Sequence, residues 1–218
     1  MYNLDMKKQQ VITAIEKYVR SIMQKDSSGH DYWHIDRVRK IALKIGKKEN
    51  ADLFVVELAS LLHDIDDWKF KKGGQRVKKV KSLLSQLSVE QKVINNIINI
   101  IKNVSYKGSK VKRRLRTIEA KVVYDADKLD TLGAIGIARI FATGANRERV
   151  LYNPEIPLSK KVGDYRKRDS YSSIHHFYDK ILTLKNTLNT KTAKKMAEPR
   201  HKYIKQYLNQ FFKEWKGK

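Results

Sequence analysis

The segment ELASLLHDIDDWKF, residues 57–70, places acidic and imidazole side chains directly after an apolar stretch. His63, Asp64, Asp66 and Asp67 follow residues that are typical of a helix entering a protein interior. An unpaired buried carboxylate is costly, so such groups are normally paired, protonated or bound to a metal ion. The segment therefore indicates a chemically active site inside the protein.

Other segments also bring His or Asp into apolar helical patterns. A single buried histidine is more often a hydrogen-bonded core residue than a ligand, so the convergence of several segments is what carries weight. A mixed set of imidazole and carboxylate ligands suits a divalent metal ion and leaves coordination positions for water and substrate. The additional segments are GHDYWHIDRVRKIALKI with His34, VVYDADKLDTLGAIGIA with Asp125, Asp127 and Asp130, and SSIHHFYDKI with His175 and His176.

The elements that position these residues are predicted to be helices. Apolar residues recur at helical spacing along nearly the whole chain, and no segment alternates with the period of two expected of a half-buried strand. We therefore predict an all-α fold, a single-domain bundle of about eight or more helices over residues 1–218. The main predicted helices cover about residues 11–22, 36–45, 51–67, 77–84, 88–101, 117–142 and 172–189, and the last ends in YIKQYLNQFFKEW.

Two features interrupt this helical pattern. Residues 143–171 form one long irregular stretch with Pro154, Pro157 and many basic residues, and loops of this length are usually lids, binding loops or disordered segments. We predict a lid or binding loop there. Pro199 leaves two alternatives for the last segment, two helices or one kinked helix.

Composition narrows the function classes. The chain has no cysteine, which excludes thiolate nucleophiles, zinc–thiolate sites and iron–sulfur clusters, so any metal must be held by His and carboxylate groups. No apolar run reaches the ~18 residues that span a membrane, and the N-terminus lacks a signal-peptide pattern. We expect a cytoplasmic protein with no membrane partner.

The 47 Lys and Arg residues exceed the 23 Asp and Glu residues, giving a net charge of +24 that attracts nucleotides and nucleic acid.

The ordered set of His34, the His63-Asp64 pair and Asp127 resembles the HD-domain superfamily of metal-dependent phosphohydrolases. The segments HDYWHIDRV, LLHDIDDWKF, VVYDADKLDTLGAIGIARIFA and SSIHHFYDKILTLKNTLNTKTA extend the resemblance over roughly residues 25–215. Together they resemble the bacterial subfamily typified by nucleoside triphosphate pyrophosphohydrolases. The chain departs from the more usual SSINHFY, so that His176 matches the family histidine and the neighbouring His175 is extra.

The resemblance implies that these four residues hold one divalent metal ion. Mn²⁺ is favoured, with Fe²⁺, Co²⁺, Ni²⁺ and Zn²⁺ as alternatives. A divalent ion lowers the pKa of bound water from about 15.7 toward ~7, and the resulting hydroxide would attack a phosphorus atom of the substrate. Asp67, four residues after His63 on the same predicted helical face, is expected to act as general acid/base, and Lys69 is expected to contact the phosphate during catalysis.

Further side chains are expected around this centre. The candidate phosphate-binding residues are Arg37, Lys107, Arg139 and His176, and for Arg139 an ion pair within the protein remains equally open. We expect Asp125 to orient a metal ligand and Asp130 to pair with a basic residue.

The function implied by the resemblance is hydrolysis of a (deoxy)nucleoside triphosphate to the monophosphate and pyrophosphate. Removal of a phosphomonoester from a nucleotide is the nearest alternative within the same chemistry. A basic nucleic-acid-binding protein is a second class, and a di-metal oxygenase, with His30 and Asp31 at a second site, is a third. A homodimer is compatible with each of these interpretations.

Overall fold

The computed structural model describes residues 2–23, 31–64, 73–104, 115–158 and 170–218. These residues form helices joined by turns and irregular segments, which confirms the predicted all-α fold of about eight or more helices. None of the described helices is long and apolar enough to cross a membrane. The elements are α1 (Tyr2–Ile22), α2 (Tyr32–Lys48), α3 (Leu53–Leu62), α4 (Gly73–Gln86), α5 (Gln91–Val104), α6 (Ile118–Asp130), α7 (Gly133–Asn146), α8 (Ser173–His176), the π-helical η1 (Phe177–Ile181), α9 (Leu182–Leu184), the 3₁₀-helical η2 (Lys185–Thr187) and α10 (Lys191–Trp215).

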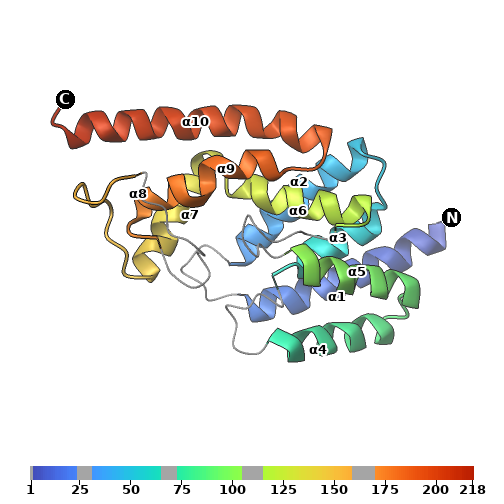
Figure 1. Ribbon diagram of the computed structural model, residues 1–218. Coiled ribbons are helices and arrows are strands. Elements are labelled where there is room, and N and C mark those ends of the chain that lie inside the picture. The colour runs from blue at the N-terminus through green and yellow to red at the C-terminus, as the bar shows by residue number, and fades with distance from the viewer. Residues whose placement is uncertain (1, 24–30, 65–72, 105–114, 159–169) are drawn as a thin grey trace.

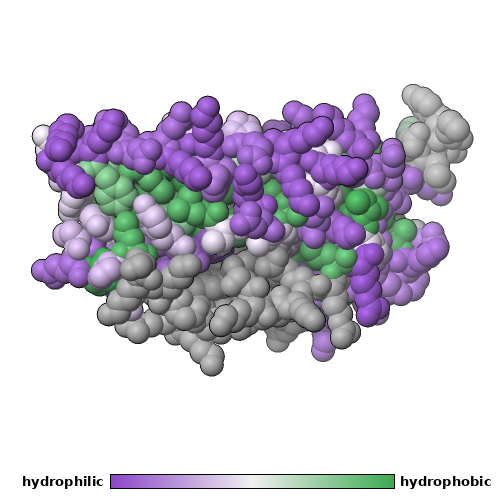
Figure 2. Space-filling view, turned by 45° about the horizontal axis from the view of Figure 1, so that its top comes forward, coloured by the Kyte–Doolittle hydropathy of each residue, from purple (hydrophilic) through white to green (hydrophobic). Residues whose placement is uncertain are grey.

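Helix α2 occupies the middle of the molecule and packs against both α3 and α6 (Figure 1). Helix α10 runs along one side, where it contacts α7 and α6, and α4 lies on the opposite side against α5. Figure 2 shows hydrophilic side chains along the side that α10 covers, above a band of hydrophobic ones. Because α2, α3 and α6 meet in the interior, residues at their ends can converge on one point.

One cluster of buried apolar residues joins the helices. Val38 of α2, Leu58 of α3 and Val122 of α6 are fully buried within it, and Ile97 brings in α5. These residues repeat every three or four positions along their helices, which places them on one face of each helix. Burial of this apolar face holds the three central helices in register, and the candidate site depends on that register.

The helices that carry the site begin at capped N-termini. The side chain of Asp31 accepts a hydrogen bond from the backbone N–H of His34, and Asp52 caps α3 in the same way. Thr117 caps α6 through the backbone N–H of Ala120. These side chains satisfy backbone donors that have no partner within the helix. The cap at Asp31 also fixes the first turn of α2, in which His34 lies.

The predicted helix over 117–142 is wrong in one respect, because it is two helices. Helix α6 ends at Asp130 and α7 begins at Gly133. Gly133 adopts a φ of +79°, a left-handed conformation that breaks the helix and that L side chains rarely adopt. The apolar pattern continues through this break, so periodicity alone did not reveal it.

The helix predicted over 51–67 ends earlier, at Leu62. His63 is the residue at its C-terminal end, and its Nδ1 donates a hydrogen bond to the carbonyl oxygen of Ser60 at 2.7 Å. A side chain that satisfies a terminal carbonyl in this way is a common feature of helix ends. Asp67 lies outside the described residues, so its position relative to His63 stays a prediction.

The C-terminal third contains two further differences from the predicted helices. The helix over 172–189 is divided into α8, η1, α9 and η2, which include a π-helical and a 3₁₀-helical turn. In contrast, the segment around Pro199 is one continuous helix, α10, from Lys191 to Trp215. Pro199 is exposed on this helix.

Candidate metal centre

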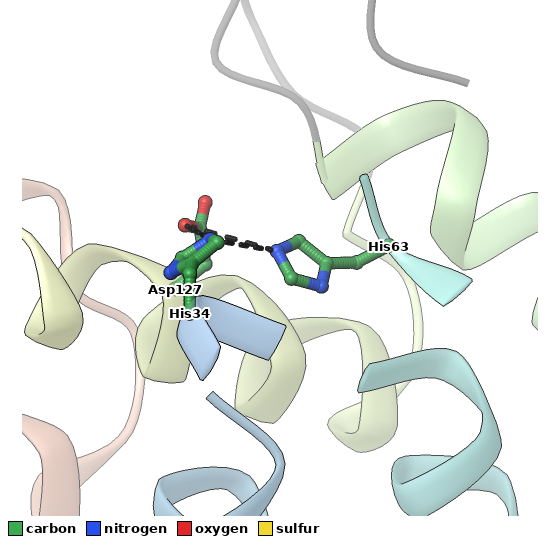
Figure 3. Close-up of side chains that lie close together, drawn as sticks. All are labelled: His34, His63 and Asp127. Carbon is green, nitrogen blue, oxygen red and sulfur yellow. Dashed lines mark hydrogen bonds and ion pairs between the residues drawn. The ribbon is translucent and has the colours of Figure 1, made fainter. Parts of the chain in front are cut away.

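Three helices bring imidazole and carboxylate groups together in the interior (Figure 3). His34 comes from the first turn of α2, His63 and Asp64 follow α3, and Asp127 lies on α6. The Nε2 atoms of the two histidines are 3.3 Å apart. Asp127 Oδ1 lies 3.7 Å from Nε2 of His34 and 4.0 Å from Nε2 of His63.

Asp64 adds a fourth group to this cluster. Its Oδ2 lies 3.3 Å from Nε2 of His34, and its Oδ1 lies 3.4 Å from Nε2 of His63. Both carboxylate oxygens therefore face the histidine nitrogens. Asp64 and both histidines are buried, and Asp127 is partly buried, so the cluster is largely screened from bulk water.

Hydrogen bonds to the Nδ1 atoms, on the side away from the cluster, fix the orientation of both imidazoles. Nδ1 of His34 donates to Asp130 Oδ2 at 2.8 Å, and Nδ1 of His63 donates to the carbonyl oxygen of Ser60. Because Nδ1 carries the proton in each ring, the lone pair of the neutral imidazole is on Nε2 and points into the cluster. Metal-binding histidines usually have such a carboxylate or carbonyl acceptor behind them.

Lys128 fixes the orientation of Asp127. Its Nζ donates to Asp127 Oδ2, so Oδ1 is the oxygen that faces the histidines. The Lys128 residue is only 5% exposed, and its Nζ also lies 5.0 Å from the centre of the Tyr124 ring. Burial alone would raise the pKa of Asp127, but the positive charge of Lys128, the largest opposing influence, holds that pKa well below its usual range.

The residues present fit a divalent metal ion. Ligand atoms bound at about 2.1 Å to one ion are about 3 to 4 Å from one another, and the nitrogen and oxygen distances in this cluster fall in that range. His34, His63 and Asp127 each offer one ligand atom, and these three atoms lie within 4.8 Å of one another. Without a cation, two buried imidazole lone pairs and two carboxylates facing one point would repel each other.

Comparison with known proteins gives the family. An HD domain model matches residues 32–132, the region that contains all four residues of the cluster. The Bacillus subtilis protein YpgQ is 36% identical over 214 residues, which are 97% of each chain. The chain belongs to the HD-domain family.

Solved structures show that the similarity extends over nearly the whole chain. A crystal structure of Bacillus subtilis YpgQ in complex with ADP is 37% identical, has a TM-score of 0.75, and covers 93% of this chain and 97% of its own. An HD-superfamily hydrolase from Bacillus thuringiensis is 40% identical, has a TM-score of 0.77, and covers 97% of this chain and 100% of its own. The protein is therefore a YpgQ-like HD-superfamily hydrolase, an enzyme.

In this HD hydrolase, Asp130 is the acceptor for three separate groups. In addition to His34, it binds Arg37, whose Nε donates to Oδ1 at 2.8 Å, and Arg139, whose Nη1 donates to Oδ2 at 3.0 Å. Burial would raise the pKa of Asp130, but the hydrogen bonds from His34 and Arg37, with the nearby positive charges, hold it well below its usual range. Asp130 thus pairs with basic residues, as expected, and also orients a histidine of the cluster.

Burial and the charge of Arg139 lower the pKa of His34, whereas the hydrogen bonds to Asp130 and Asp64 raise it, and the net direction is upward. The same carboxylates that would help His34 to hold a proton also help it to hold a cation.

The expectation for Asp125 is wrong. Asp125 does not touch the cluster, because its two oxygens accept hydrogen bonds from the backbone N–H groups and side chains of Asn189 and Thr190 at 2.7 to 3.1 Å. It therefore joins α6 to the start of α10. Asp125 is two residues from Asp127, and side chains at that spacing point to different sides of a helix. Asp130 is three residues from Asp127 and lies on the same side of the helix, so this spacing in the sequence indicates a position near the cluster.

The other predicted site residues fall into two groups. Arg37 and Arg139 both donate hydrogen bonds to Asp130, next to the cluster. Nδ1 of His176 lies 3.0 Å from Oγ of Ser170. Their contacts with substrate stay predictions. Asp67, Lys69 and Lys107 lie outside the described residues, as do Asp66 and His30.

His175 has a structural explanation. It is fully buried, its Nδ1 lies 2.8 Å from Ser172 Oγ, and its Nε2 donates to the carbonyl oxygen of Ile156 at 3.1 Å. It therefore fastens part of the irregular segment 147–158 to α8. Lys128 was missed by the sequence analysis, since a lysine within an apolar helix gave no sign of which carboxylate it would meet.

Proposed function

We propose that the protein hydrolyses nucleotide phosphates with one divalent metal ion, converting a (deoxy)nucleoside triphosphate to the monophosphate and pyrophosphate. The observation that carries this proposal is the orientation of His34 and His63, whose Nε2 atoms face each other at 3.3 Å while both Nδ1 atoms are held from behind. The crystal structure of the Bacillus subtilis relative with ADP supports a nucleotide as the substrate class.

His34, His63, Asp64 and Asp127 would hold the ion. When bound, the ion lowers the pKa of water and offsets negative charge that develops on the phosphoryl oxygens. We favour Mn²⁺, with Fe²⁺, Co²⁺, Ni²⁺ or Zn²⁺ as alternatives, since nitrogen and oxygen ligands together fit Mg²⁺ less well. Asp130 and Lys128 would act as positioning residues, the first for the His34 ring and the second for the Asp127 carboxylate.

The remaining roles complete the proposal. Asp67 would transfer protons and Lys69 would contact the phosphate, and both follow the cluster closely in the sequence. Arg37, Arg139, Lys107 and His176 are the proposed substrate contacts. Arg37 and Arg139 both donate to Asp130, the same carboxylate that accepts a hydrogen bond from His34. One residue therefore separates each guanidinium group from a proposed metal ligand. A positive potential there would favour a multiply charged substrate.

The test is a product analysis. Metal-stripped protein is incubated with nucleoside tri-, di- and monophosphates and a panel of divalent ions, and the products are resolved by ion-exchange chromatography. Formation of monophosphate and pyrophosphate with Mn²⁺ supports the proposal. Free orthophosphate from a monophosphate would instead assign a phosphomonoesterase, and the absence of any product would favour the basic nucleic-acid-binding protein.

Matched variants make this test specific. His63→Ala and Asp67→Ala should each abolish product formation. His201→Ala, a histidine of α10 that does not take part in the cluster, should leave it unchanged. Equal loss in His63→Ala and His201→Ala would contradict the assignment of the metal centre.

A further inference from the structure

A pocket lies behind the metal centre, on the side of Asp130. It has a volume of about 360 Å³, which is within the range of pockets for small organic ligands. Asp130 forms part of its wall, and Asp130 contacts His34 through Nδ1, whereas the metal-facing nitrogen is Nε2. The His34 ring and the Asp130 carboxylate therefore stand between this pocket and the cluster.

Cationic side chains from two helices surround the pocket. Arg37 and Lys40 come from α2, and Arg200 comes from α10. Two carboxylates lie close by: Asp130 is already bound by His34, Arg37 and Arg139, and Asp36 pairs with Lys40 at 2.7 Å. Cationic groups thus outnumber carboxylates around the pocket, and the potential inside it is positive.

Arg200 is the least compensated of these cations. Its Nη1 donates to the carbonyl oxygen of Leu129 at 2.5 Å, and none of the carboxylates in the described residues forms an ion pair with it. Burial lowers the pKa of Arg200, and the charge of Asp130 only partly opposes this effect. A half-buried guanidinium whose charge is only partly compensated gains from binding an anion, because the anion replaces water that burial has removed.

The rest of the wall is apolar. Ile41, Leu132, Ala134 and Ile135 line it, and Ile135 is 47% exposed although it is a large aliphatic residue. Gly133 and Ala134, the first two residues of α7, complete this wall. The pocket therefore joins a cationic rim to an apolar wall, and together these can hold a phosphate group and a weakly polar ring.

We propose that this pocket binds a nucleoside monophosphate, with the phosphate at Lys40 and Arg200 and the base against Ile41 and Ile135. The site is separate from the metal centre and goes beyond the proposed function, since it requires neither the metal ion nor turnover. A bare phosphate would use only the cationic rim, and a nucleoside only the apolar wall.

Isothermal titration calorimetry of the full chain with AMP, in EDTA and again with Mn²⁺, tests the site. AMP should bind in EDTA, and inorganic phosphate and adenosine should each bind more weakly than AMP. Binding that appears only with Mn²⁺ would assign AMP to the metal centre and overturn this inference while leaving the proposed function intact. Phosphate that binds as tightly as AMP would also overturn it, because the apolar wall would then contribute nothing.

Two matched pairs of variants locate the ligand. Lys40→Glu should weaken AMP binding by about tenfold or more, because a charged hydrogen bond is replaced by repulsion. Lys44→Glu, one turn further along α2 and outside the pocket lining, makes the same charge change and should weaken binding by less than about threefold.

Ile135→Ser should weaken the binding of AMP but not of phosphate, whereas Leu151→Ser, at a residue with similar exposure elsewhere, should change neither. Equal effects within either pair would overturn the inference. All four positions are exposed, so these substitutions are not expected to unfold the protein.

Discussion

Oδ2 of Asp130 lies 2.8 Å from Nδ1 of His34, and the same carboxylate holds the guanidinium groups of Arg37 and Arg139. This arrangement decides which nitrogen of His34 faces the cluster. It also places two permanent cations near the metal centre without placing them on its ligands. The geometry of the site therefore depends on a residue that is not itself a metal ligand.

Asp130→Asn should lower metal affinity. The amide removes the negative charge that stabilises His34 as a ligand, and loss of such a supporting carboxylate typically costs about 10- to 100-fold in metal affinity. Titration of metal-stripped protein with Mn²⁺, followed by calorimetry, measures this. Asp36→Asn, an acid of α2 that pairs with Lys40, is the control. An affinity equal to that of the Asp36→Asn control would show that Asp130 does not orient His34.

Removal of the metal should lower thermal stability. An ion that binds only the folded protein adds about 2.7 kcal/mol when its concentration is a hundredfold above Kd. For a chain of this length each kcal/mol corresponds to roughly 2–4 °C, so Mn²⁺ should raise Tm by about 5–10 °C over EDTA. Differential scanning calorimetry measures both states. His63→Ala should show no difference between Mn²⁺ and EDTA, and a preserved difference would place the ion elsewhere.

Lys128→Met should destabilise the metal-free protein by about 3–5 kcal/mol, because it leaves the charge of Asp127 buried without its partner. Mn²⁺ should restore much of this loss, since the ion supplies the missing positive charge. Urea unfolding with and without Mn²⁺ measures the effect. Lys121→Met, on the same helix but only partly buried, should lose little stability in either condition. Equal destabilisation with and without Mn²⁺ would contradict the role of Lys128 at Asp127.

Asp125→Asn should destabilise the protein by about 3 kcal/mol and leave metal affinity unchanged, because charged hydrogen bonds contribute roughly 1.5–3 kcal/mol each and some donors lose their acceptor. The affected donors belong to Asn189 and Thr190. Urea unfolding and Mn²⁺ titration on the same preparation give both quantities. A fall in metal affinity comparable to that in Asp130→Asn would show that Asp125 supports the centre after all.

Glu16 should make stability depend on acid pH. Its Oε1 accepts a 2.6 Å hydrogen bond from the hydroxyl of Tyr32, and this bond, the largest influence, lowers the pKa of Glu16 although burial opposes it. Because the folded pKa is below the unfolded value, the stabilisation is fully present above the ordinary glutamate pKa of 4.5 and is lost as pH falls through the folded pKa. The difference in urea midpoint between wild type and Glu16→Gln should therefore disappear at low pH. A difference in urea midpoint that stays constant as the pH is lowered from 7 through the pKa of Glu16 would contradict this linkage.

The sequence predicted the fold class because each buried helix face repeats its apolar residues every three or four positions. Val38 and Ala42 of α2, for example, mark the face that packs in the core. The breaks were less visible. The split at Gly133 follows from one residue adopting a φ of +79°. Helix α3 ends at Leu62, where the His63 side chain bonds back to the carbonyl oxygen of Ser60. Neither feature changes the apolar pattern around it.

The sequence by itself determined that the chain carries His34, His63, Asp64 and Asp127 in apolar segments. The convergence of imidazole and carboxylate groups indicated a divalent metal ion, and the family resemblance implied that these four residues hold it. Only the tertiary structure decided how these groups are oriented. Asp130 meets a histidine 96 positions away, and Asp125 meets Asn189 at 64 positions. Such pairings depend on which helix faces pack together, and packing is a property of the whole core rather than of any one segment.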